Sequence, residues 1–272
     1  MKKILILLLF IGQVAISQAT IAQNLAPDFK VKIIGGTNVA ANDPIAQSTV
    51  LIWGENFKTT FICTGSIIAP DLILTAGHCL GGNGYARLTV YFRTELDGQG
   101  PSLSVTQQIR MSDTFPDSDK GWEDLAILKL EKNIPDGYHP AKILSDAKMI
   151  QDGAPVILAG YGINIPISEG SDDGRGILRS VEQNILQSQF TPTDILINIK
   201  DKGSCKGDSG GPAFFRQGND LLLFGVMSHL TENDRIADDG RNKRYSCLVD
   251  VVYTNILAQQ GWINSTIKTL EK

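Results

Sequence analysis

The chain has 272 residues, with 25 basic and 29 acidic side chains and a formal net charge of −4. This length is enough for one large domain or two small ones. The acidic balance argues against a nucleic-acid partner, because phosphate contacts need clustered lysines and arginines.

The N-terminal segment has the features of a secretory signal peptide. Met1-Lys2-Lys3 is a charged start, and the apolar run of residues 4–11 follows it. The run is short for a membrane span, and no later stretch reaches membrane length. We predict a signal peptide over residues 1–19, with a second candidate cleavage point after Ala22, and a secreted (extracellular or periplasmic) protein with no stable membrane anchor after processing. An uncleaved N-terminal anchor is the alternative.

The cysteines and the acidic residues indicate whether disulfides or metal sites are to be expected. Four cysteines in an exported chain favour two disulfides, although the sequence alone allows three pairings. Free or metal-binding thiols are the alternative, but no two cysteines have CxxC spacing. No loop has an acidic cluster with the spacing of a calcium site. We predict no metal and no cofactor, and calcium binding is the alternative that the sequence leaves open.

Most of the chain consists of short apolar runs broken by Gly, Asn, Asp and Pro, which is typical of strands and turns. The predicted strands are residues 49–53, 72–74, 88–92, 125–130, 155–159 and 221–226. Strands at this spacing indicate an all-β sandwich or barrels. Only the segment 254–270 has apolar residues near helical spacing.

One histidine and one aspartate stand beside these predicted strands. His78, in Leu74-Thr75-Ala76-Gly77-His78-Cys79, follows the strand 72–74, and Asp124 precedes the strand 125–130. Each has a simpler interpretation when seen alone. A histidine beside a cysteine is more often structural or a metal ligand, and an acid before a strand is often an ordinary cap.

The segment Gly203-Ser204-Cys205-Lys206-Gly207-Asp208-Ser209-Gly210-Gly211-Pro212 places one serine in a glycine-rich turn. Backbone N–H groups in such a turn can converge on a carbonyl oxygen beside the hydroxyl. Serine is a poor nucleophile unless a base lies within hydrogen-bond reach. The chain has only three histidines, so His78 is the candidate base, and Asp124 is the candidate for holding its ring.

The order His78, Asp124 and Ser209, with these flanking residues, resembles the trypsin/chymotrypsin family of serine peptidases, whose catalytic triad is a general template. The resemblance covers the chain from residue 33 onward. It implies two antiparallel six-stranded β-barrels packed together with a C-terminal helix, and an active site in the crevice between the barrels. We expect the first barrel and a linker over 33–145, and the second barrel and the helix over 146–272.

The resemblance also implies a role for each residue. Ser209 would attack a peptide or ester carbonyl, His78 would carry the proton, and Asp124 would fix the imidazole tautomer. The backbone N–H groups of Gly207 and Ser209 would form the oxyanion hole. The implied disulfides are Cys63–Cys79 and Cys205–Cys247.

The sequence Lys32-Ile33-Ile34-Gly35-Gly36 looks like the activation junction of the family. Cleavage after Lys32 would free the ammonium group of Ile33, which would pair with Asp208 and set the Gly207 amide in place. Residues 20–32 would then be a propeptide. The alternative is that this segment is only a strand that ends in a turn.

The substrate pocket departs from the trypsin pattern. We call the segment 203–212, which carries Ser209, the serine loop. Trypsin-like members have an acid two residues before the cysteine of this loop, and this chain has Gly203 at that position. His229 stands where the family usually has Trp, and Leu230 stands where a Gly leaves the pocket open. We expect a preference for small or medium uncharged side chains. The residues that the resemblance places in the pocket are Gly203, Ser204, Lys206, Ser228, His229, Leu230 and Val251, and Ser228 would also hydrogen-bond Asp124.

The sequence thus predicts a secreted, monomeric serine endopeptidase, made as a zymogen, whose partners are protein or peptide substrates and an activating protease. A binding protein of the same fold, with its pocket closed by the segment 231–244, is the first alternative. An esterase of the α/β-hydrolase kind is the second, since Gly207 to Gly211 matches Gly-x-Ser-x-Gly. That fold, however, needs a strand-to-helix turn and the chain order Ser, Asp, His.

Overall fold

The structure is a computed structural model, and its described residues are 35–56, 59–81, 87–112, 123–163, 174–198, 202–231, 235–236, 244–245, 247 and 249–271. The predicted signal peptide, the propeptide and Ile33 therefore lie outside the described residues. None of the helices within these ranges has the length and apolar character needed to cross a membrane.

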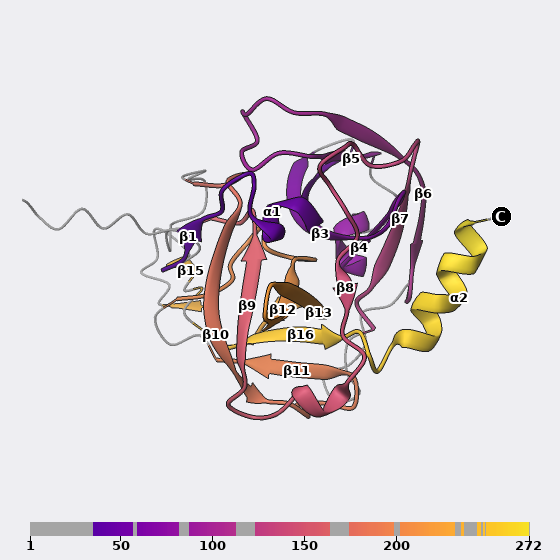
Figure 1. The fold of residues 1–272 in the computed structure, drawn as a ribbon. Coiled ribbons are helices and arrows are strands. Elements are labelled where there is room, and N and C mark those ends of the chain that lie inside the picture. The colour runs from indigo at the N-terminus through magenta and orange to yellow at the C-terminus, as the bar shows by residue number, and fades with distance from the viewer. Residues whose placement is uncertain are drawn as a thin grey trace, which may run out of the picture. The chain divides into compact units, whose positions relative to one another are not determined.

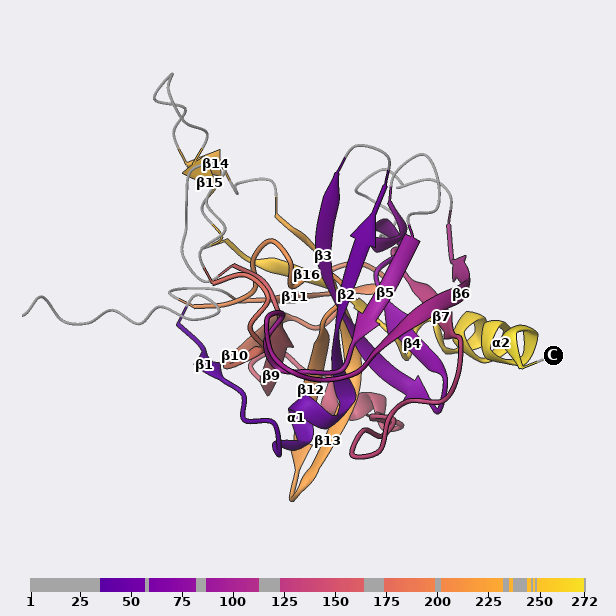
Figure 2. The same cartoon turned by 90° about the horizontal axis from the view of Figure 1, so that it is seen from above.

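Six strands form a closed antiparallel barrel in the first half of the chain (Figure 2). They are β2 (Thr49–Glu55), β3 (Thr60–Ala69), β4 (Leu72–Thr75), β5 (Arg87–Tyr91), β6 (Ser102–Arg110) and β7 (Ala126–Leu130), in the order β2-β3-β4-β7-β6-β5. Alternate side chains point inward, as in β5, where Leu88 and Val90 are buried. Closure of the sheet leaves no free edge strand.

A second set of six antiparallel strands forms another barrel (Figure 1). They are β9 (Pro155–Gly160), β10 (Arg179–Gln187), β11 (Asp194–Ile197), β12 (Pro212–Gln217), β13 (Asp220–Leu230) and β16 (Val251–Asn255). The order is β10-β11-β16-β13-β12-β9, and β9 also pairs with β10, which closes the ring. The predicted fold class is confirmed: two six-stranded antiparallel barrels and a C-terminal helix, the chymotrypsin-like fold.

Short elements complete the fold and connect the two barrels. Strand β1 (Thr37–Asn38) pairs with β10, and β8 (Lys142–Ile143) pairs in parallel with β13. The C-terminal helix α2 (Gln260–Leu270) packs against β7, so the end of the chain returns to the first barrel. The other elements are α1 (Pro44–Ser48), two 3₁₀ turns (Gly77–Leu80 and Ala147–Met149), β14 (Arg235–Ile236) and β15 (Arg244–Tyr245).

The predicted start of the C-terminal helix is wrong. The helix begins at Gln260, because Thr254 lies in β16 and is paired with Asp194 on one side and Val226 on the other. Ile256, which suggested a helical pattern, is buried just after the strand. The six predicted strands all correspond to observed strands, with ends that differ by up to four residues.

The segment 231–244, predicted to close the pocket in the binding-protein alternative, is described only in part. Its described residues include β14, which pairs with β15 in a short antiparallel ladder. Figure 2 shows this ladder apart from the strands of the second barrel.

Candidate active site

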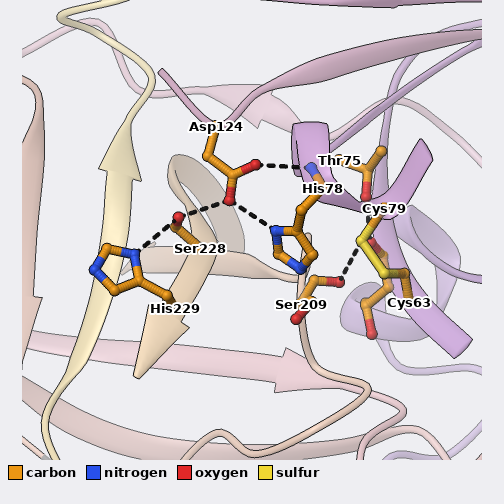
Figure 3. A network of polar contacts seen from close by, with 9 residues as sticks. Cys63, Thr75, His78, Cys79, Asp124, Ser209, Ser228 and His229 are labelled. Atoms are coloured by element: carbon orange, nitrogen blue, oxygen red, sulfur yellow. Dashed lines mark hydrogen bonds and ion pairs between the residues drawn. A yellow bond between two sulfur atoms is a disulfide. The ribbon is translucent and has the colours of Figure 1, made fainter. Parts of the chain in front are cut away.

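His78 and Asp124 meet because their strands are neighbours in the first barrel. Thr75 at the end of β4 pairs with Ala126 at the start of β7. His78 lies three residues after Thr75, in the 3₁₀ turn, and Asp124 lies two residues before Ala126. The His78 Nδ1 atom is 2.8 Å from Asp124 Oδ2, and the backbone N–H of His78 donates to Asp124 Oδ1 at 2.9 Å (Figure 3). Both carboxylate oxygens therefore hold His78.

The second barrel supplies a further hydrogen bond to the same carboxylate. The hydroxyl of Ser228, on β13, donates to Asp124 Oδ2 at 2.7 Å. The Nδ1 atom of His229 lies 3.1 Å from Ser228 Oγ. Asp124 is only 2% exposed, and three donors compensate for its burial.

His78 and Asp124 each stabilise the charged form of the other. Burial lowers the pKa of His78, but the charge of Asp124 and the hydrogen bond to it raise that pKa above its usual value. Burial raises the pKa of Asp124, but the charge of His78 and the hydrogen bonds from His78 and Ser228 lower it below its usual value. Asp124 is therefore a carboxylate at neutral pH, positioned to stabilise an imidazolium.

The serine loop is attached to the first barrel through Thr64 on β3. The Thr64 N–H donates to the carbonyl of Ser209 at 2.8 Å, and the Thr64 hydroxyl donates to the carbonyl of Gly207 at 2.9 Å. The same hydroxyl accepts from the N–H of Tyr161 at 3.1 Å. Sequence reasoning missed Thr64, since nothing in its neighbours marks it out from other strand threonines.

Glycine is required at Gly210 by both its conformation and its neighbours. Its φ is +79°, and a Cβ atom would lie 2.0 Å from Thr75 Oγ1 and 2.4 Å from the carbonyl oxygen of Thr64. The loop thus packs directly on the first barrel. Ser209 lies at this contact, with its carbonyl 3.6 Å from the sulfur of Cys79. Figure 3 shows its side chain at the edge of the His78 ring that faces away from Asp124.

Two backbone N–H groups next to the predicted oxyanion hole, those of Asp208 and Gly210, donate to carbonyl groups of the protein. The N–H of Asp208 donates to the carbonyl of Cys205 at 3.1 Å, and that of Gly210 donates to the carbonyl of Met227 at 2.8 Å. Gly207, one of the two predicted donors, has a φ of +97°, a conformation that favours glycine.

The side chain of Asp208 is buried against Gly160 and Gly162, at the end of β9 in the second barrel. Its oxygens accept from the backbone N–H groups of Gly162 and Cys205, both at 2.7 Å. A Cβ atom at Gly160 or Gly162 would overlap this side chain. Burial raises the pKa of Asp208 to about 6, against the effects of these amides and of the charge of Arg179. The predicted partner, Ile33, lies outside the described residues.

Three of the predicted pocket residues lie beside the second disulfide: Ser204 and Lys206 flank Cys205, and Leu230 packs against the cystine. Ser204 is buried, with its hydroxyl 2.8 Å from the hydroxyl of Tyr253. Leu230 is partly buried and packs against Ile163 and the disulfide. Val251 is fully buried in the core of the second barrel. Gly203 is buried and Lys206 is exposed, while Ser228 and His229 lie in the hydrogen-bond network at Asp124.

Both disulfides have the pairing that the family resemblance implies, Cys63–Cys79 and Cys205–Cys247. Cys63, His78 and Cys79 are close enough together to suggest a metal site. The two sulfur atoms are bonded to each other, however, so they are not thiolates and do not fit a metal ion. The first disulfide instead anchors the turn that carries His78.

Comparison with known proteins agrees with this geometry. The family model described as Trypsin matches residues 33–250. Hypodermin-B of Hypoderma lineatum is 25% identical over 92% of this chain and 93% of its own length, and a trypsin of Sarcophaga bullata is 22% identical over 97% and 100%. Glucanase inhibitor protein 3 of Phytophthora infestans is 28% identical over 88% and 90%. The chain therefore belongs to the trypsin family of serine peptidases, with distant relatives that match it over most of its length.

Proposed function

We propose that the protein is a secreted serine endopeptidase that hydrolyses peptide bonds with Ser209, His78 and Asp124. The observation that carries this proposal is the bond between His78 and a buried Asp124 carboxylate beside the serine loop. Burial of a carboxylate beside an imidazole costs stability because the charge loses its contact with water. A reaction in which the ring carries a proton gives a reason for that cost. Two disulfides are consistent with an exported protein.

In the proposed reaction, the hydroxyl of Ser209 attacks the substrate carbonyl and its proton passes to Nε2 of His78. The N–H groups of Gly207 and Ser209 bind the oxyanion that forms. The imidazolium then gives its proton to the leaving amine, and an acyl-enzyme remains on Ser209. Water, activated by the same imidazole, releases the acid product. Asp124 remains ionised and keeps the Nδ1 proton of His78 in place throughout.

The test is covalent labelling of the protein after cleavage at Lys32, with a sulfonyl fluoride or a small organophosphate. Mass spectrometry should find the adduct on Ser209 in the wild type and not in His78→Ala. Because these reagents need only the nucleophile and its base, the result does not depend on knowing the substrate. An unlabelled wild type, after confirmed processing, would refute the proposal.

We also propose that cleavage after Lys32 activates the enzyme. Asp208 is buried and its pKa is raised to about 6, so a nearby ammonium group would stabilise its carboxylate. The new N-terminus of Ile33 would be that group. Ile33→Gly should abolish activity with little change in stability, and full activity of the uncleaved precursor would exclude the mechanism.

The proposed preference is for small or medium uncharged residues at the cleaved position. Gly203 offers no carboxylate for a basic side chain, and Leu230 packs on the disulfide beside it. Discrimination between apolar side chains is only about 1–3 kcal/mol per methylene, so the preference should be broad.

A second candidate function is binding without catalysis. It is favoured by one relative, named as a glucanase inhibitor, which is 28% identical to this chain. The complete hydrogen-bond network around Asp124 makes the peptidase the better proposal, since a binding protein has no need of it. The labelling experiment separates the two.

A further inference from the structure

His229 is the residue next to Ser228, and the two side chains form a hydrogen bond. In a regular strand, neighbouring side chains point to opposite faces and do not meet. Here the register of β13 against β16 shifts between Met227 and His229, so Ser228 is the extra residue of a β-bulge. The bulge turns adjacent side chains toward each other, and Nδ1 of His229 comes within 3.1 Å of Ser228 Oγ.

The direction of each hydrogen bond from His229 through Ser228 to Asp124 can be assigned. The Asp124 carboxylate can only accept, so Ser228 must use its single hydroxyl proton in the bond to Asp124. The oxygen of Ser228 therefore accepts from His229, which must carry a proton on Nδ1. Burial lowers the pKa of His229 to about 4, so the ring is neutral at pH 7 with its proton on Nδ1.

The hydrogen bonds form a continuous series that ends at the proposed base. His229 donates to Ser228, Ser228 donates to Asp124 Oδ2, and the same oxygen bonds Nδ1 of His78 (Figure 3). A serine hydroxyl can rotate, and a donor on its oxygen restricts that rotation. A neutral donor does this without adding positive charge near the imidazolium.

We propose that His229 is a positioning residue of the peptidase: its Nδ1–H fixes the hydroxyl of Ser228 toward Asp124, and thereby fixes the carboxylate that holds His78. This role rests on the proposed function.

Matched variants of His229 test the proposal. In His229→Asn, the amide nitrogen is attached to the same carbon position as Nδ1 and can still donate to Ser228. In His229→Gln, the amide is one bond further out and cannot replace that donor. Each is made in the wild type and in Ser228→Ala, and His229→Phe is a second variant without a donor in case His229→Gln does not fold.

Two readouts are measured. The first is kcat and KM for peptide hydrolysis, and the second is the pKa of His78 from NMR titration of the ring protons, which the presence of only three histidines makes simple to assign. We expect His229→Gln to lower kcat about fivefold, the effect of one neutral hydrogen bond. It should also shift the pKa of His78, and His229→Asn should restore both values. In Ser228→Ala, changing His229 should have no further effect.

The outcomes separate this inference from the proposed function. Equal effects of His229→Gln with and without the Ser228 hydroxyl would overturn the positioning role, as would equal behaviour of His229→Asn and His229→Gln or no effect of either. If the wild type hydrolyses no peptide, the proposed function fails, and the NMR titration still decides whether His229 acts on His78 through Ser228.

Discussion

Replacing Thr64 by valine removes the hydrogen bond from the Thr64 side chain of the first barrel to the serine loop. The Thr64 hydroxyl donates to Gly207 at 2.9 Å and accepts from the buried N–H of Tyr161 at 3.1 Å. Valine has a similar shape, so the substitution opens no large cavity. The substitution leaves the backbone N–H of Tyr161 without its hydrogen-bond acceptor, and the carbonyl of Gly207 loses one hydrogen-bond donor. Each unpaired buried group costs about 1–3 kcal/mol, so Thr64→Val should lower the free energy of unfolding by about 2–4 kcal/mol.

The assay is urea unfolding together with the rate of covalent labelling at Ser209. We expect Thr64→Val to lower both the unfolding midpoint and the labelling rate, and Thr64→Ser, which keeps the hydroxyl, to retain most of each. Thr49→Val is the matched control, since the buried Thr49 hydroxyl has no hydrogen-bond partner among the described residues. That change should be neutral or slightly stabilising. If Thr64→Val and Thr49→Val behave alike, the hydroxyl of Thr64 does not hold the loop.

Three more predictions concern the packing of the serine loop and the pair of His78 and Asp124. Gly210→Ala should lower the free energy of unfolding, measured in urea, by at least about 3 kcal/mol, because it combines a positive φ with overlap against the Thr64 carbonyl. Gly218, with φ +60° and open space around it, is the control, and Gly218→Ala should lower that free energy by only about 1–2 kcal/mol. Equal losses would contradict the packing of Gly210 on the first barrel. The pKa of His78 is raised above 6.5, so its pairing with Asp124 stabilises the fold below pH 6.5, and this contribution is lost as the pH rises through the folded-state pKa. The labelling rate, which needs the neutral ring, should rise over that same range above pH 6.5. In Asp124→Asn burial remains without the attraction, so NMR titration should place the pKa of His78 below 6.5, whereas an unchanged pKa would show that Asp124 does not control it.

Local sequence patterns alone did not predict the two barrels or the pairing of the disulfides. Both predictions also needed the family resemblance. Alternating and continuous apolar runs marked the strands, as in β2 and β13, because burial decides which strand residues are apolar. The pattern by itself indicated only an all-β protein. The order and closure of the strands depend on pairings between residues far apart in the chain, such as β9 with β12.

The parts that sequence reasoning missed depend on contacts between the two barrels or on local irregularity. Thr64 is important because of what it meets across the interface, and its own neighbours are those of any strand residue. The bond between His229 and Ser228 needs a bulge, which a single sequence does not mark. The helix start was misplaced because Ile256 continues an apolar pattern from a buried strand into the turn after it.

Peptide hydrolysis by the processed protein is the most direct measurement of the proposed mechanism. The protein cleaved after Lys32 is incubated with a diverse peptide mixture, and mass spectrometry identifies each bond that is cut. We expect cuts after small or medium uncharged residues in the wild type, and none with Ser209→Ala or His78→Ala prepared in the same way. A wild type that leaves every peptide intact, or a Ser209→Ala protein that cuts equally well, would contradict the mechanism.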